Sequence, residues 1–350
     1  MSLECSDMSL DSFIPTGKLP PELLRELLKK YAIRDPRVVV GPGIGEDAAI
    51  IDMGDRFLVA KTDPVTFATD DIGWYAVHVN ANDVACCGAT PKWFLATLLL
   101  PEKSTTPELA ESIFAQLAEA CEQLGVSLCG GHTEITHGLD RPIVVGQMLG
   151  EVPRDGYLTS GGALIGDALI LTKGIAIEGT AIIAREKREE LLDAVSEAVL
   201  DRCAKLLRSP GISVVRDAAI AQEAGGVHAL HDPTEGGIAT GLWELSEASA
   251  VGIVVDQWRL PVLSECAAMC QYLGLDPLGL IASGSLLIAA AKERADSTVE
   301  RLQSHGIAAT QIGEVVPREC GCRLRSEDGT QQPLPVFARD EITRLFGSAD

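Results

Sequence analysis

Three aspartates within the first ninety residues stand in contexts that suit a metal site. Asp47 closes a glycine-rich run, Asp63 follows a short apolar run, and Asp83 lies in a helical stretch. Proteins hold Mg²⁺ with carboxylates from several elements, because this ion takes hard oxygen ligands and shares them with substrate phosphates. The chain is therefore expected to fold so that a loop, a strand and a helix meet at one place.

Size and charge narrow the class of protein. A length of 350 residues suffices for two domains of ordinary size. The net charge is −21, and a surface this acidic repels nucleic-acid backbones and anionic membranes, so neither is an expected partner. Aromatic residues make up only 4%, whereas there are 34 glycines, so small aliphatic side chains must fill the core and tight turns must be frequent.

The sequence predicts a cytoplasmic protein with reduced thiols. No apolar run reaches the roughly 18–20 residues that a membrane span needs. Residues 1–8 lack the basic and apolar segments of a signal peptide, and whether residues 1–7 are native stays open. The ten cysteines show no spacing typical of a zinc site or a disulfide framework.

The order of expected elements predicts two α/β halves behind a helical leader, residues 1–37. The first domain is expected over 38–155, with strands at 48–51, 56–61, 93–100, 126–129 and 142–152 and helices at 70–87 and 107–124. The second is expected over 156–346, with strands at 166–173 and 225–232 and helices at 186–207 and 238–250.

The first motif is the glycine run before Asp47. Gly43 and Gly45 let the backbone approach a ligand closely, and successive N–H groups there can surround an anion. The alternative is a mobile turn with a solvated acidic pair. No Gly-Lys-Ser/Thr follows, so this is not a Walker-type phosphate loop.

The second and third aspartates also allow two interpretations each. Asp63, after Lys61 and Thr62, suits a metal ligand but also a cap or a turn. Asp83, after Asn82 in a stretch of small residues, would be buried and would need a metal, a lysine or backbone donors as partner.

Two further glycine pairs follow strands. Gly130 and Gly131, with Thr133, suit a ligand contact, or else a tight turn in which His132 is structural. Asp232 and Thr234 precede Gly236-Gly237 at the start of a helix, where free N–H groups and the helix dipole favour phosphate. The alternative is a simple helix N-cap at Asp232 or Thr234.

Taken in order over residues 38–340, these segments resemble the AIR synthetase (PurM-like) superfamily. The segments are Gly45-Glu-Asp47-Ala-Ala, Thr62-Asp63, Asn82-Asp83-Val-Ala-x-x-Gly-Ala-x-Pro91, Gly130-Gly-x-Thr133 and Asp232-Pro-Thr-x-Gly-Gly237. The nearest branch is that of the hydrogenase expression/formation proteins, the carbamoyl dehydratases, whose second-half motif has the same Asp-Pro-Thr-x-Gly-Gly form. Thiamine-monophosphate kinases usually have another motif there.

The resemblance implies a two-domain α/β (α+β) fold whose N-terminal domain pairs with its copy into a shared sheet or barrel. It also implies ATP and Mg²⁺ as cofactors, with Asp47, Asp63 and Asp83 around the metal. Asp232 and Thr234 would then be catalytic. The nucleotide would contact Gly43, Gly45, Lys61, Thr62, Asn82, Gly130, Gly131, Thr133, Gly236 and Gly237.

Two departures limit what the resemblance says about the reaction. The carbamoyl dehydratases carry their substrate on a C-terminal cysteine in a Pro-Arg-x-Cys tail, whereas here the similar Pro317-Arg-Glu-Cys320 lies thirty residues before the end. Their acidic Asn-Glu-Gly segment corresponds to Ile281–Leu286, which has no glutamate. No cysteine precedes the first glycine turn at the place where selenophosphate synthetases carry their catalytic cysteine, which argues against selenophosphate synthesis.

Three hypotheses about function follow. The first is an enzyme that uses ATP and Mg²⁺ to phosphorylate an oxygen of an unknown small substrate, of which a thiamine-monophosphate-kinase-like enzyme is one form. The second is a maturation-factor relative that binds nucleotide and a partner protein. The third is a non-catalytic dimeric binding protein.

Overall fold

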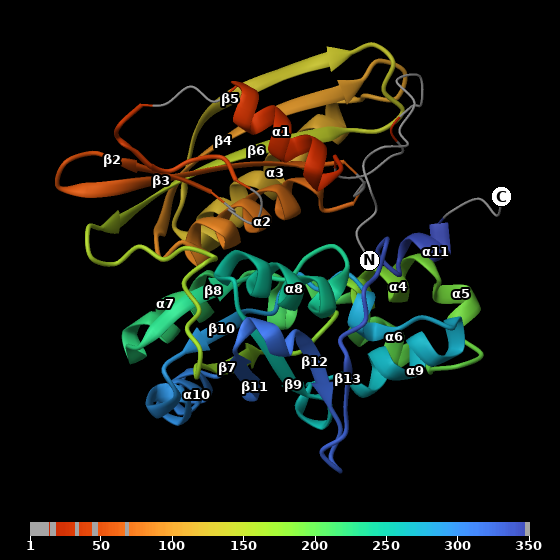
Figure 1. Ribbon diagram of the computed structural model, residues 1–350. Coiled ribbons are helices and arrows are strands. Elements are labelled where there is room, and N and C mark those ends of the chain that lie inside the picture. The colour runs from red at the N-terminus through yellow and green to blue at the C-terminus, as the bar shows by residue number, and fades with distance from the viewer. Residues whose placement is uncertain (1–13, 15–18, 32–34, 44–47, 67–69, 347–350) are drawn as a thin grey trace.

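The computed structural model describes residues 14, 19–31, 35–43, 48–66 and 70–346. It forms two α/β domains, each built on a mixed sheet (Figure 1). The predicted fold class is therefore confirmed. Among the described helices, none is both long and apolar enough to cross a membrane.

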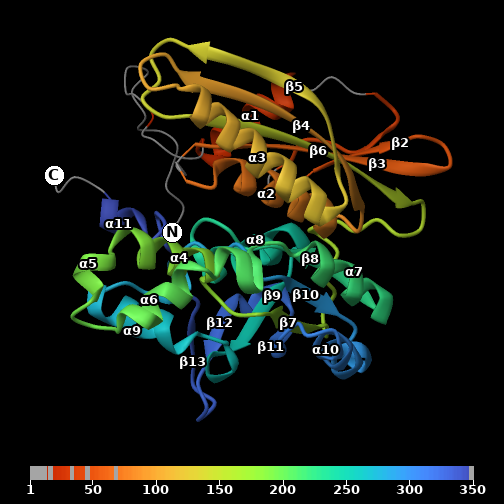
Figure 2. The same ribbon diagram turned by 180° about the vertical axis from the view of Figure 1, so that it is seen from behind.

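The N-terminal domain contains a six-stranded sheet in the order β1-β2-β3-β6-β4-β5, in which only the β4–β5 pair is parallel. Helices α2 and α3 lie on one side of this sheet and α1 on the other (Figures 1 and 2). The elements are α1 Pro21–Tyr31, β1 Val38–Val40, β2 Ala49–Asp52, β3 Arg56–Val65, α2 Ile72–Cys86, β4 Thr90–Pro101, α3 Pro107–Leu124, β5 Ser127–Thr136 and β6 Ile143–Pro153.

The C-terminal domain contains a seven-stranded sheet in the order β13-β12-β9-β11-β7-β10-β8. Its strands are β7 Ala168–Thr172, β8 Val227–His231, β9 Gly252–Asp256, β10 Leu287–Ala290, β11 Ala309–Val316, β12 Cys322–Arg325 and β13 Gln331–Pro333. Its helices are α4 Ile177–Glu186, α5 Arg188–Leu191, α6 Glu197–Ala204, α7 Val215–Ala224, α8 Gly237–Ser249, α9 Ser264–Leu273, α10 Ala295–Ser304 and α11 Thr343–Phe346. Single helical turns are Leu207–Gly211, Gln257–Arg259, Pro277–Gly279, Lys292–Arg294 and Arg318–Cys320.

Strand β7 shows how this second sheet is covered. All five of its residues are buried, as expected for a strand with protein on both faces. Leu169 and Leu171 belong to the core formed with α8, whereas Ala168 and Ile170 belong to the core formed with α7 and α10. The helices therefore cover opposite faces of the sheet.

Local sequence signals account for several elements. The side chain of Thr106 accepts a hydrogen bond from the Leu109 N–H and caps α3, and Gly125 ends that helix in the left-handed conformation with φ 65°. The helix expected over 238–250 is confirmed as α8 within a residue, and the strands expected at 48–51 and 56–61 pair as β2 and β3, although β3 continues to Val65. These elements carry their start and stop signals in their own sequence.

Three expectations about elements were wrong. Gly130 and Gly131 lie inside β5 and not in a turn after it. The helix expected over 186–207 is divided into α5, α6 and a final turn. Asp63 lies within β3, which continues to Val65, and so is not a strand-end residue.

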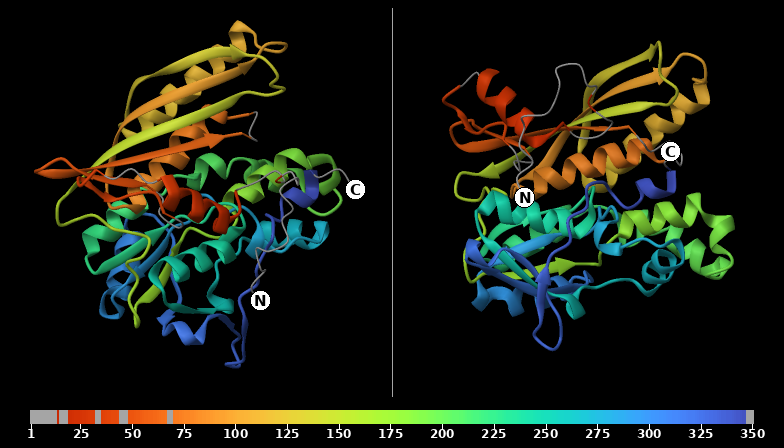
Figure 3. Two further views of the ribbon diagram at one scale, coloured as in Figure 1. Left: turned by 45° about the horizontal axis from the view of Figure 1, so that its top comes forward. Right: turned by 45° about the vertical axis from the view of Figure 1, so that its right-hand side comes forward.

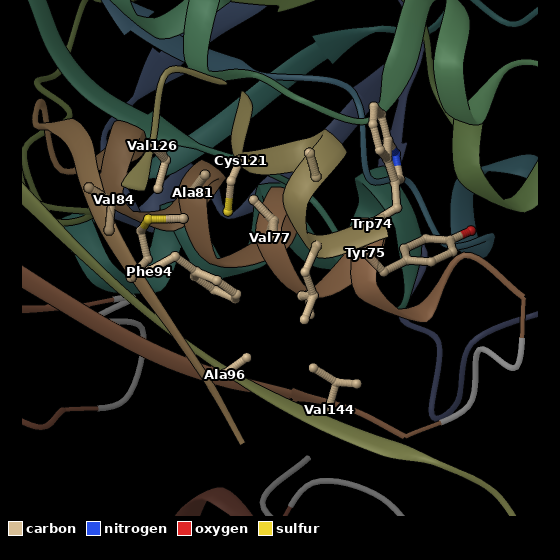
Figure 4. Packing of buried hydrophobic residues seen from close by; sticks show 14 of the residues in the cluster. Trp74, Tyr75, Val77, Ala81, Val84, Phe94, Ala96, Cys121, Val126 and Val144 are labelled. Atoms are coloured by element: carbon tan, nitrogen blue, oxygen red, sulfur yellow. The ribbon is translucent and has the colours of Figure 1, made fainter. Parts of the chain in front are cut away.

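Helix α2 connects the two domains. Of its residues, all except Val79 are buried, so the helix is enclosed on nearly all sides. One side packs on the first sheet, as Figure 4 shows for Val77, Ala81 and Phe94. Its last turn, Ala85 and Cys86, belongs to a core of the C-terminal domain. A single helix is thus shared by both domains, which lie one above the other in both views of Figure 3.

Polar contacts reinforce this connection at the start of α2. Asp71 accepts hydrogen bonds from Arg185 at 2.9 Å and from Arg208 at 2.6 Å, both from the C-terminal domain. The Arg208 guanidinium also lies 3.6 Å from the centre of the Trp74 ring, a cation–π contact.

The glycine pair of β5 allows a first prediction, because only one of the two glycines is required by the backbone. A Cβ on Gly131, whose φ is 149°, would lie 1.9 Å from the Ala96 carbonyl oxygen. A Cβ on Gly130 would lie 3.6 Å from its nearest atom, in Leu95. We expect Gly131→Ala to lower the free energy of unfolding by about 2 kcal/mol or more and Gly130→Ala to change it by less than about 0.5 kcal/mol. Urea unfolding of both variants measures the difference, and equal effects would contradict it.

Candidate functional site

Lys61, Asp63 and Asp83 come together between β3 and α2. Phe57 and Val59 are buried residues of β3, and the alternation of a strand puts Lys61 and Asp63 on the same side, towards α2. The Lys61 Nζ lies 2.9 Å from the Asp83 Oδ2 and 3.8 Å from the Asp63 Oδ2. Of the partners considered for Asp83, a lysine is therefore the one that the structure shows.

The side chains of Asp63 and Asp83 differ in how far they are exposed to solvent. The side chain of Asp83 is 9% exposed and that of Asp63 is 41% exposed. Asp83 is thus held inside the protein by a cationic partner, whereas Asp63 reaches solvent. Asp63 and Asp83 together offer hard oxygen ligands that suit Mg²⁺, and substrate phosphates would supply further ligands.

Other predicted residues of the N-terminal domain lie elsewhere. Gly45 and Asp47 are outside the described residues, and Gly43 is an exposed loop residue after β1. Thr62 alternates to the side of the sheet opposite Lys61, and its hydroxyl donates to the Gly146 carbonyl at 2.9 Å. Within the described residues, no three His, Cys, Asp or Glu side chains form a metal-binding group.

Asn82 uses both atoms of its amide between the domains. Its Nδ2 donates to the Ile212 carbonyl at 2.9 Å, and its Oδ1 accepts from the Val214 N–H at 2.8 Å. Both contacts are buried, so they fix the 212–214 loop against α2. A role for Asn82 towards a nucleotide stays a prediction.

Gly130, Gly131 and Thr133 are distant from the carboxylates within one chain. Asp63, Gly146, Ala96 and Gly131 form one row across β3, β6, β4 and β5. Three strand spacings separate the ends of this row, about 14 Å. The structure therefore does not bring the edge-strand segment to Asp63 and Asp83 in a single chain.

The turn after β8 meets the end of α2. The Cys86 Sγ donates to the Asp232 Oδ1 at 3.5 Å, and Asp232 is only 3% exposed. Cys86 follows Asp83 by three residues, so both lie on the same side of α2. Thus the last turn of α2 brings the Asp83 pair and the Asp232 turn to one region.

The remaining residues of this turn are held by their own backbone. The Thr234 carbonyl accepts from the Gly237 N–H at 3.1 Å and from the Ala282 N–H at 3.2 Å. Gly236 and Gly237 have φ of 78° and 67°. A Cβ on Gly237 would lie 2.4 Å from the Leu278 carbonyl oxygen. Glycine is therefore required here by conformation and close packing.

A carboxylate already stands at the start of α8. The Gly236 N–H donates to the Asp340 Oδ2 at 2.6 Å, and the Asp340 Oδ1 accepts from the N–H groups of Ile281 and Ile342. Asp340 takes the place of an anion at a helix N-terminus. For the Gly236 N–H to bind a phosphate, its hydrogen bond to the Asp340 carboxylate would first have to break.

Sequence reasoning missed Glu178, in the first turn of α4. Burial raises the pKa of Glu178 from its ordinary 4.5 to about 7, although hydrogen bonds with Ser283 lower it. Its Oε2 has no hydrogen-bond partner among the described residues. The available signal was a single acid inside the apolar run Ile175-Ala-Ile-Glu-Gly-Thr-Ala181.

Two more buried polar groups along α2 were missed. Burial lowers the pKa of His78 to about 3, so the ring is neutral, and neither ring nitrogen has a hydrogen-bond partner in the described part of the chain. Lys173 forms a buried ion pair with Asp217 at 3.2 Å and donates to the Ser213 carbonyl at 2.6 Å. A surface hollow lies elsewhere, between α7 and α10, and is lined by none of the predicted site residues.

Comparison with known proteins assigns both domains to described families. Residues 45–152 match the model of the AIR synthase related protein, N-terminal domain. Residues 165–323 match that of the AIR synthase related protein, C-terminal domain. The chain is 33% identical over 318 residues to the carbamoyl dehydratase HypE of Cupriavidus necator, covering 86% of each protein.

Solved structures of HypE proteins have the same fold. A HypE in complex with ATP superposes with a TM-score of 0.69 at 25% identity, over 93% of this chain and 97% of that one. The HypE of a HypE–HypF complex superposes with a TM-score of 0.72 at 25% identity, over 90% and 99%.

The raised pKa of Glu178 predicts how stability changes with pH. Because the folded protein holds this proton more tightly than the unfolded chain, stability falls as the pH rises from about 4.5 to about 7. The two pKa values differ by about 2.5, which corresponds to about 3 kcal/mol. We expect Glu178→Gln to be more stable than the wild type by up to that amount at pH 8, and by little near pH 5.

Urea unfolding at both pH values measures this difference. The control is Glu189→Gln, the same change at an exposed position of the neighbouring α5, which should leave stability unchanged. Equal destabilisation by Glu178→Gln at both pH values would contradict the prediction.

Proposed function

Because this chain belongs to the AIR synthase-related family, we propose that it is an ATP- and Mg²⁺-dependent enzyme that activates an oxygen of a small substrate by phosphorylating it. The similarity to a HypE that binds ATP supports the nucleotide. The reaction class is phosphoryl transfer, in which positioning and charge neutralisation do most of the work. We place the enzyme in the cytoplasm, where ATP is abundant.

One observation carries the proposal: acidic groups of both domains meet at the last turn of α2. Asp83 is paired with Lys61 of β3, and Cys86, three residues later, contacts Asp232 of the C-terminal domain. An arrangement of this kind lets one domain hold the nucleotide while the other presents the substrate. Ligand sites commonly lie at such domain boundaries.

The proposed roles follow this division. Asp47, Asp63 and Asp83 would hold Mg²⁺, which when bound neutralises phosphate charge and fixes phosphate orientation. Lys61 offsets the charge of Asp83 inside the protein. Asp232, buried beside Cys86, and Thr234 would orient the reacting groups of the substrate.

The other proposed nucleotide contacts are Gly43, Gly45, Thr62, Asn82, Gly236, Gly237 and the β5 segment with Gly130, Gly131 and Thr133. Since that segment lies about 14 Å from Asp63 within one chain, we expect its contribution to come from a second copy. A homodimer would thus complete the site.

The outer face of the first sheet is suited to such a dimer. The residues that alternate away from α2 and α3 are apolar and half-buried at Leu58, Leu95, Leu99 and Leu149. Beside them Trp93 is 37% exposed. An apolar sheet face of this kind is suited to burial against a partner.

A second candidate is a maturation factor that binds nucleotide and a partner protein without turnover. The similarity to the HypE of a HypE–HypF complex favours it. Steady release of ADP in the presence of candidate small substrates separates the enzyme from this alternative. Tight ATP binding without any ADP release, together with co-purification of a partner, would favour the alternative.

The metal-site proposal predicts which aspartate matters for nucleotide binding. We expect the wild type to bind Mg-ATP in calorimetry and Asp63→Asn to bind it at least about 10-fold more weakly, because one metal-binding carboxylate is lost. Asp55→Asn is the control, since Asp55 is exposed at the turn of the same hairpin. Absence of Mg-ATP binding by the wild type, or equal affinities of the two variants, would refute the proposed site.

The dimer proposal predicts that a charge on the outer face separates the copies. Leu95→Glu places a carboxylate in the centre of that face, where burial against a partner would be costly. We expect sedimentation to show a dimer for the wild type and a monomer for this variant. Phe114→Glu, at a 45% exposed position on α3 behind the sheet, should remain a dimer. A monomeric wild type would exclude this interface.

A further inference from the structure

Glu178 occupies a buried position at the boundary between the domains. It belongs to the first turn of α4, is 5% exposed, and has Ser283 as its hydrogen-bond partner. The following residue, Gly179, donates its N–H to the Ile281 carbonyl, and the Ala282 N–H donates to the Thr234 carbonyl. The 281–283 loop therefore links Glu178 directly to the turn that carries Asp232 and Thr234.

Three elements around Glu178 carry titratable groups that interact with it electrostatically. The turn before α8 contributes Glu235, the C-terminal segment contributes Asp340, and both repel a negative charge on Glu178. Helix α2 contributes Tyr75, whose own pKa is raised by burial and by Glu178, whereas Arg185 acts on Tyr75 in the opposite direction. Tyr75 lies near the first turn of α2, beside Trp74 (Figure 4).

The hydrogen bonds with Ser283 satisfy only one of the two oxygens of the Glu178 carboxyl group. The Oε2 atom is buried and has no hydrogen-bond partner in the described part of the chain. An unsatisfied buried carboxyl oxygen is costly, so a purely structural role would favour an apolar residue here. The Oε2 atom therefore keeps the capacity to accept a hydrogen bond from a proton donor of a substrate.

We propose that Glu178 is the general base that takes the proton from the acceptor group as this group attacks the γ-phosphate. This inference rests on the proposed phosphoryl transfer. The acceptor is of the class that loses a proton on phosphorylation, namely a hydroxyl, an amide or water. It approaches between Tyr75 of the N-terminal domain and the 281–283 loop.

The step balances without any further reactant. The proton of the acceptor moves to the Glu178 Oε2, and the electron pair left on the acceptor oxygen forms the bond to the γ-phosphorus. The bond from that phosphorus to the bridging oxygen breaks, and ADP leaves with its electron pair. Glu178 then returns the proton to water when the product leaves.

The pKa of about 7 supports this role, since a base is most effective when its pKa lies near the working pH. Burial is the main cause of the raised pKa, and the neighbouring acids add to it. Glu178 is distant in sequence from the proposed metal ligands, and among the described residues its hydrogen-bond partner is Ser283.

The test uses Mg-ATP alone, with water as the acceptor, on both sides of pH 7. We expect the rate of ADP release by the wild type to rise through about pH 7 and level off. Glu178→Gln should lose this rise and fall by roughly 10²–10⁴-fold in kcat, with unchanged affinity for Mg-ATP. Calorimetry in buffers of different ionisation enthalpy should also show proton uptake on Mg-ATP binding in the wild type, because the triphosphate charge raises the pKa of Glu178, and none in Glu178→Gln.

Asp167→Asn is the matched control, because it removes a buried carboxylate beside His228 outside this region. It should keep the pH profile and the proton uptake. Binding of Mg-ATP with the same profile and proton uptake in wild type and Glu178→Gln would overturn the inference while leaving the proposed function intact. If the wild type bound no Mg-ATP, the proposed function itself would fail, and the inference with it.

Discussion

Helix α2 must satisfy its polar side chains where water does not reach. It is buried between the first sheet and the C-terminal domain, yet it carries Asn82, Asp83 and Cys86 in its last turns. Their partners are the 212–214 loop, Lys61 and Asp232, and each belongs to a different element. Because an unpartnered buried polar group costs free energy, these three contacts fix the relative positions of β3, the loop and the Asp232 turn. The two domains and the candidate site depend on the same helix.

Much of the fold was predictable because its signals are local. Thr106 and Gly125 mark the ends of α3 in the sequence itself, and the β2–β3 hairpin shows short apolar runs around a turn. Partners distant in sequence were not predictable in this way. Asp83 could be predicted to need a partner, but only the folded chain shows that Lys61 supplies it. The burial of α2 on nearly all sides could not be predicted for the same reason, since part of the surface that packs on this helix belongs to the second domain.

The glycines show why the site was harder to predict than the fold. A ligand that approaches the backbone and a backbone with positive φ both select glycine, so the sequence alone does not distinguish the two causes. At Gly131 and Gly237 the structure shows the second cause, a positive φ, and a Cβ would in addition lie too close to a carbonyl oxygen. At Gly236 it adds Asp340, an acid from the far end of the chain that occupies the helix N-terminus. These glycines are therefore weaker indications of phosphate binding than their spacing suggests. Asp63 and Asp83 remain candidates for metal binding, because the structure brings them together.

The two ends of α2 differ in how a buried acid is compensated. Near its last turn Asp83 has the cationic partner Lys61, so a full negative charge is tolerated there. Near its first turn Glu178 faces Tyr75 and has only a hydroxyl residue as its partner, and two further acids lie close by, so burial favours its protonated form. Residues 75 and 83 are eight positions apart, about 12 Å along the helix. The two ends of one helix thus hold a charged acid beside a cation and an acid that burial favours in its protonated form.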